Sequence, residues 1–119
     1  MSRSRWHIRD ADGVLTLSRR LPARFDVAAE TRLPAASASR VAHQVRQDLW
    51  RRLQDVRGFQ PVVQVTRGDR ALTVRAGGSV AARAFPRARI EAEIAALLAD
   101  DAYRARWIAH ATRRGAADA

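Results

Sequence analysis

The spacing of apolar residues changes repeatedly along this chain, and these changes constrain the fold more than any other feature. In residues 5–18 and 61–75, large apolar residues alternate with polar ones around steps that contain glycine and aspartate. This spacing is typical of half-buried strands joined as β-hairpins. Residues 37–58 and 86–111 instead carry apolar residues at the three- and four-residue spacing of helices. The predicted order is hairpin, helix, hairpin, helix.

This order predicts an α+β fold, an antiparallel sheet of about four or five strands with the helices packed on one face. Alternation in the first hairpin should turn Trp6, Ile8, Leu15 and Leu17 toward the core. Residues 19–36 contain two prolines and show no clear period, so whether they hold a further element is left open beyond a short extended piece around Phe25.

Residues with cap and turn chemistry set the expected ends of the elements. Ser37 or Ser39 should cap the first helix, and Gly58 should end it. We expect the pair Gly77-Gly78 to break the second hairpin, and residues 79–85 to form another short strand. Pro86 suits the first turn of the next helix, which the pair Asp100-Asp101 should cap and restart.

The length of 119 residues and the apolar fraction of 47% predict one folded domain, with residues 1–114 forming it and residues 115–119 fraying. No apolar run approaches the roughly 20 residues of a membrane span. The basic start of the chain is not followed by the apolar segment of a secretory signal. We therefore expect a cytoplasmic protein, and the absence of cysteine excludes disulfides and thiolate chemistry.

Charge is where the composition departs most from the average. The chain has 22 basic residues, all arginine, against 12 acidic ones, for a net charge of +10. Codon bias in a GC-rich genome explains arginine in place of lysine, but it does not explain the excess of positive charge. Arginine forks two donors onto a phosphate or a carboxylate, so we expect either nucleic acid or an acidic protein as the partner.

Motifs for catalysis are missing from the sequence. The three histidines, His7, His43 and His110, are far apart, without the close spacing of metal ligands. The serines and aspartates singled out above are better explained as helix caps, and Gly77-Gly78 lacks the context of a phosphate loop. We expect a non-catalytic chain without cofactor, metal or small-molecule substrate.

Nucleic-acid binding through the uncovered sheet face is the first functional hypothesis. Alternation would place cations and short polar side chains on that face, without an acid among them. The predicted binding residues are Arg5, His7, Arg9, Gln64 and Arg75. Exposed aromatic side chains like those of base-stacking RNA-binding sheets are not expected there. The alternative interpretation is an ordinary solvated sheet face.

A protein-interaction subunit or adaptor is the second hypothesis. Its expected anchors for an acidic partner are Trp50, Arg46, Arg51 and Trp107. Ion pairs of Asp48 with Arg51 or Arg52, and of Asp55 with Arg51, should neutralise part of the first helix. A phosphate binder should gather its arginines on one continuous face, whereas an adaptor should show an exposed apolar centre ringed by arginine. Self-association stays open in both cases.

Overall fold

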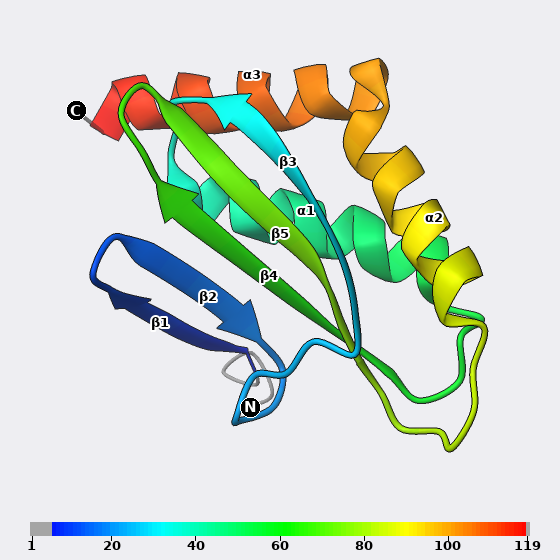
Figure 1. The fold of residues 1–119 in the computed structure, drawn as a ribbon. Coiled ribbons are helices and arrows are strands. Elements are labelled where there is room, and N and C mark those ends of the chain that lie inside the picture. The colour runs from blue at the N-terminus through cyan, green and yellow to red at the C-terminus, as the bar shows by residue number, and fades with distance from the viewer. Residues whose placement is uncertain (1–5, 119) are drawn as a thin grey trace.

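The protein is a five-stranded antiparallel sheet packed against three helices, which confirms the predicted fold class (Figure 1). The computed structural model describes the backbone of residues 6–118 and the side chains of residues 6–112. The sheet order is β1-β2-β4-β5-β3. The elements are β1 (His7–Ala11), β2 (Val14–Ser18), β3 (Val27–Pro34), α1 (Ala38–Leu53), β4 (Phe59–Arg67), β5 (Ala71–Val80), α2 (Arg87–Ala99) and α3 (Asp101–Asp118).

Both predicted hairpins are present. β1 and β2 are joined by Asp12 and Gly13, whose φ angles of 55° and 79° are those of a type I′ turn. This turn matches the natural twist of the two strands. β4 and β5 pair along their whole length, from Phe59 opposite Val80 to Arg67 opposite Leu72.

The predicted division between a domain and a tail at residue 114 stays a prediction.

The core lies between the sheet and the helices. α1 packs on β2, β4 and β5, whereas α2 packs mainly on β3 and α3 mainly on α1. Leu15, Leu17 and Trp107 are fully or almost fully buried there. The expectation that Ile8 is a core residue is wrong, because its side chain is 51% exposed. β1 makes extensive contacts with β2 alone, so no described helix covers Ile8.

The stretch left open in the sequence contains β3, which forms one edge of the sheet and pairs with β5. β5 itself is continuous from Ala71 to Val80, so the expected break at Gly77-Gly78 and the expected strand over residues 79–85 are both wrong. The two glycines instead allow the backbones of the neighbouring strands, β3 and β4, to approach β5 closely. A Cβ atom on Gly77 would overlap the carbonyl oxygen of Val27, and one on Gly78 would overlap that of Gln60.

Two of the predicted helix ends are confirmed and one is wrong. Ser37 caps α1 by accepting a hydrogen bond from the backbone N–H of Arg40 at 3.3 Å. Asp100 caps α3, accepting from the N–H groups of Ala102 and Tyr103 at 2.9 and 3.2 Å. Gly58 does not end α1, because the helix stops at Leu53. With a φ of 77°, Gly58 instead shapes the turn that leads into β4.

A buried carboxylate joins α1 to α3. Oδ2 of Asp48 accepts from Trp107 Nε1 at 2.7 Å and from Arg106 Nη2 at 2.7 Å. The predicted pairing of Asp48 with Arg51 or Arg52 is therefore wrong. Asp48 is buried and points away from both, toward α3.

The two arginines that were expected to pair within α1 have other surroundings. Arg52 reaches Glu93 of α2 at 3.7 Å. The expected pair of Asp55 with Arg51 is not formed in the described part of the chain, where both side chains are exposed. Much of the positive charge of α1 is consequently not neutralised within the helix itself.

None of the helices in the described residues is long and apolar enough to cross a membrane.

Replacing Gly77 with alanine should destabilise the protein by about 3 kcal/mol or more, because the added methyl group collides with the backbone of β3. Chemical denaturation followed by circular dichroism measures this. Gly68→Ala is the matched control: there the nearest heavy atom to a new Cβ is 3.3 Å away, and the loss should stay within about 1 kcal/mol. Equal losses in the two variants would contradict the close packing of β3 on β5.

Replacing Asp48 with alanine should cost about 3 kcal/mol, because it leaves the buried indole N–H of Trp107 without an acceptor and breaks the ion pair with Arg106. Asp48→Asn keeps one oxygen acceptor and should cost about half as much. Urea denaturation measures both. A loss below about 0.5 kcal/mol for Asp48→Ala would show that the carboxylate does not hold α3 on α1.

Candidate anion-binding site

The strand register brings Arg9, Gln64 and Arg75 into one row across the open sheet face. Arg5 lies outside the described residues. His7, Arg9 and Gln64 line a hollow of about 430 Å³ on the sheet face that the helices leave open. Leu21 and Pro22, from the loop after β2, line the same hollow. Gln64 is held by a hydrogen bond from its Nε2 to Thr16 Oγ1 at 3.3 Å.

Arg75 lies beside Gln64, its register partner on β4, and makes further contacts of its own. Its guanidinium stacks on the ring of Phe25, with Cζ 4.4 Å from the ring centroid. Its register partner on β3 is Glu30, so the open face is not free of acids as predicted. The prediction missed this carboxylate because it had not recognised β3 as a strand.

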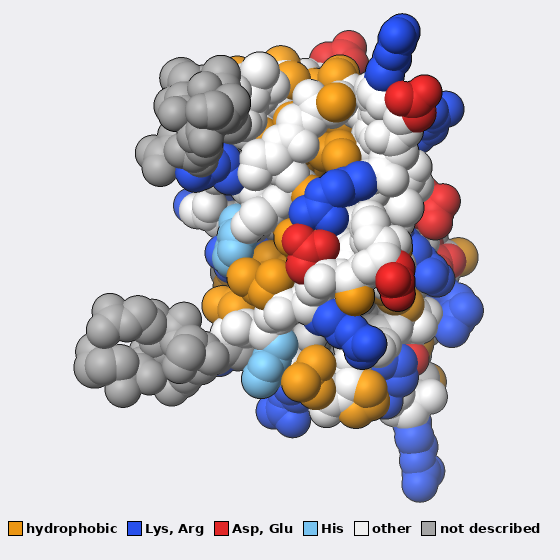
Figure 2. Space-filling view, turned by 90° about the vertical axis from the view of Figure 1, so that its left-hand side faces the viewer, with side chains coloured by type: hydrophobic (Ala, Val, Ile, Leu, Met, Phe, Trp, Pro, Cys, Tyr) orange, Lys and Arg blue, Asp and Glu red, His pale blue; other side chains and the backbone are white. Residues whose placement is uncertain are grey.

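Arginines are also spread over the surface rather than gathered. Viewed from the side of the β1–β2 hairpin, cationic side chains lie among hydrophobic and acidic ones (Figure 2). Near this edge, Nη1 and Nη2 of Arg67 each donate a hydrogen bond to a carboxylate oxygen of Asp10 at 2.9 Å, which makes a fork. That fork lowers the pKa of Asp10 and raises the pKa of Arg67.

The expected protein-partner anchors have different positions. Trp107 is completely buried, so it is a core residue and not an anchor. Arg51 is exposed on α1. Trp50 is 44% exposed, one of the large hydrophobic side chains that reach the surface. Trp50 lies one helical turn after Arg46, so both occupy the same flank of α1.

Arg46 and Trp50 meet two residues from the first hairpin, and we call these four residues the Trp–Arg site: Trp6, Arg19, Arg46 and Trp50. They line a hollow of about 300 Å³ together with Gln60 and Pro61. The Cζ atoms of Arg46 and Arg19 lie 4.6 and 5.7 Å from the centroid of the Trp6 ring. Both distances are within cation–π range.

The hairpin register explains how Trp6 and Arg19 come together. His7 pairs with Ser18, so the residues just beyond them on each strand, Trp6 and Arg19, emerge side by side. α1 lies over β2 and β4 and brings Arg46 to the same ring. Sequence reasoning found Arg46 and Trp50 but missed Trp6 and Arg19. The register of the predicted hairpin was the signal that could have placed them.

The electrostatics of the site favour an anion. Burial, and then the positive charge of Arg19, lower the pKa of Arg46. Nε of Arg46 is buried and has no hydrogen-bond partner in the described structure. No carboxylate is among the residues that line the hollow. Among the described residues, two cations thus share one ring without a carboxylate lining the hollow, an arrangement that a bound carboxylate or phosphate would stabilise.

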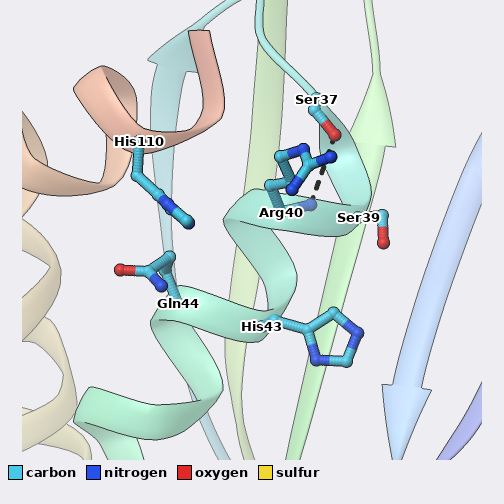
Figure 3. A pocket seen from close by; sticks show the side chains of 6 residues that line it. All are labelled: Ser37, Ser39, Arg40, His43, Gln44 and His110. Carbon is cyan, nitrogen blue, oxygen red and sulfur yellow. Dashed lines mark hydrogen bonds between the residues drawn. The ribbon is translucent and has the colours of Figure 1, made fainter. Parts of the chain in front are cut away.

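The histidines do not build a second site. His43 and His110 line a hollow of about 460 Å³ at the start of α1, with Arg40 and Gln44. In the close view, His110 extends from α3 toward Gln44 of α1, whereas the imidazole of His43 points from α1 to the other side (Figure 3). The described residues contain no group of side chains suited to a metal ion.

The chain matches no family model, no curated protein and no solved structure.

Replacing Arg46 with glutamine should raise the pKa of His43. Burial and then the charge of Arg46 hold that pKa below its ordinary 6.5, so folding favours the neutral imidazole and stability falls as the pH drops below 6.5. Removing the cation lifts only part of the shift, because burial remains. NMR titration of the imidazole measures it, with Arg57→Gln as the control. An unchanged pKa in Arg46→Gln would contradict the electrostatic contact.

Proposed function

We propose that this chain is a non-catalytic binding module that holds an acidic segment of a partner protein at the Trp–Arg site. One observation carries the proposal: Arg19 and Arg46 stack on the same indole, beside the exposed Trp50, with no carboxylate lining the hollow. The cytoplasmic location expected from the sequence is part of this proposal.

Each part of the site suits a carboxylate on a protein. The guanidinium of Arg46 lines the hollow, and fork-like pairs with carboxylates are among the strongest hydrogen bonds that arginine makes. Trp50 supplies apolar area in the same hollow, and tryptophan beside arginine is a frequent anchor at protein interfaces. An exposed apolar centre with arginines around it is the pattern expected of an adaptor.

Protein is favoured over nucleic acid by the state of the other arginines. A nucleic-acid backbone needs successive cations along one surface. On the open face, Arg9 and Arg75 lie in one row but are separated by Thr16 and Gln64. At the end of that row, Arg75 stacks on Phe25 and has the acid Glu30 as its register partner. In the Trp–Arg site, the Trp6 ring is already engaged by arginine and is not free to stack on a base.

A pair of double variants tests the proposal. The probes are a synthetic glutamate-rich peptide and a single-stranded oligonucleotide, and binding is followed by tryptophan fluorescence. Arg19→Gln/Arg46→Gln should weaken peptide binding by about 30-fold, because it removes both donors to the carboxylate. Arg57→Gln/Arg83→Gln removes the same charge from exposed positions elsewhere and should change affinity by less than about threefold.

The outcomes separate the two hypotheses. Equal losses in both double variants would reduce the binding to general charge attraction and overturn the proposal. Tighter binding of the oligonucleotide than of the peptide, lost in Arg9→Gln/Arg75→Gln but kept in Arg19→Gln/Arg46→Gln, would overturn it in favour of nucleic-acid binding on the open face.

A further inference from the structure

The two edge strands of the sheet, β3 and β1, differ in whether other parts of the protein bond to their outward backbone groups. At the β3 edge, the helices occupy backbone groups: Ala28 N donates to Glu91 Oε2 at 3.0 Å, and Arg104 Nη2 donates to the carbonyl oxygen of Arg32 at 2.7 Å. An incoming strand would find these groups already used. Within the described part of the chain, β1, at the opposite edge, makes extensive contacts only with β2.

The hairpin fixes which groups of β1 are free. In a two-residue hairpin the pair that closes the turn exchanges backbone hydrogen bonds, and such pairs then recur at every second position. The closing pair is Ala11 and Val14, so Arg9 and His7 also bond to β2. The backbone groups of Ile8 and Asp10 therefore point outward. No hydrogen bond joins these groups to any other residue of the described chain.

The two sides of β1 differ in chemistry. His7 and Arg9 lie on the open side, where they border the hollow that contains Gln64. Ile8 lies on the helix side and is 51% exposed. Asp10, on the same side as Ile8, is neutralised by the fork from Arg67. An added strand would thus meet the imidazole of His7 and the guanidinium of Arg9 on one side, and an apolar side chain on the other.

We propose that the acidic partner segment binds as an extra strand on the β1 edge. Its alternate residues are acidic where they face His7 and Arg9, and apolar where they face Ile8. This inference rests on the proposed function, because the same segment continues past Trp6 to reach Arg19 and Arg46. Strand addition of this kind takes affinity from backbone hydrogen bonds and specificity from alternating side chains.

Charge argues for an acidic segment over a second copy of the chain. Each copy carries a net charge of +10. Pairing of two β1 strands would bring the Arg9 guanidinium groups of both copies onto one side of the joint sheet. Like charges directly across a strand pair are destabilising, whereas glutamate or aspartate in those positions would be attracted.

Two peptides of identical composition test the inference. In one, glutamate and valine alternate; in the other, all glutamates precede all valines. The alternating peptide should bind about tenfold more tightly, since only its pattern fits both sides of β1. On binding, hydrogen exchange should slow at the amides of Ile8 and Asp10, while those of His7 and Arg9, already bonded to β2, should change little.

Ile8→Pro supplies the decisive variant. It removes the outward N–H while leaving the bonds of His7 and Arg9 to β2, and it should abolish the preference for the alternating peptide. Ile8→Val keeps the N–H and the strand, and it should retain the preference. Thermal melting of both variants establishes that the fold persists. If Ile8→Pro unfolds the protein, the exchange at Ile8 and Asp10 in the unmodified chain decides the matter.

The results distinguish this inference from the proposed function. Equal binding of the two peptides, with no protection at Ile8 and Asp10, overturns strand addition. If Arg19→Gln/Arg46→Gln still weakens both peptides in that case, the Trp–Arg site stands as the binding site without strand addition. If neither peptide responds to that double variant, the proposed function fails as well.

Discussion

The carboxylate of Asp48 is the contact on which the arrangement of the helices depends. Burying a charged carboxylate costs desolvation free energy. Hydrogen bonds from the indole N–H of Trp107 and the guanidinium of Arg106 offset this cost. Because both donors come from α3, the pair ties one flank of α1 to α3. Residues two positions apart on a helix point to nearly opposite flanks, so Arg46 is turned toward the first hairpin. The helix that carries the core contact thus also presents the Trp–Arg site.

Local sequence patterns correctly predicted the structural features that depend on neighbouring residues alone. The hairpin turn at Asp12-Gly13, the Ser37 cap and the Asp100 cap depend on neighbouring residues and were read correctly. β3 was missed because its apolar positions are few and its place is set by Gly77, a residue far away in sequence. The partner of Asp48 was missed for the same reason: a residue on another helix outcompeted the expected neighbours in α1.

The candidate site was only half predictable. Periodicity placed Trp50 and Trp107 alike at the margin of a helix face, and only packing shows that one is exposed and the other is buried. Alternation placed Arg75 correctly on the open face, but it gave no information about Glu30 on the next strand. The charge of α1 predicted Arg46 as an anchor, and that role stays a prediction. Its contact with Trp6 depends on how α1 crosses the sheet, which no local pattern contains.

The small number of contacts that hold β1 in place affects how often the proposed Trp–Arg site is fully assembled. Among the described residues, β1 makes few contacts besides those with β2, and the fork between Asp10 and Arg67 links it to β4. Segments with few buried contacts open locally at a small fraction of the free energy of global unfolding. Opening of β1 would carry Trp6 away from Arg19 and Arg46 while the core stays folded. Under the proposed function, the apparent affinity of the Trp–Arg site would therefore be scaled by the fraction of molecules in which this strand is closed.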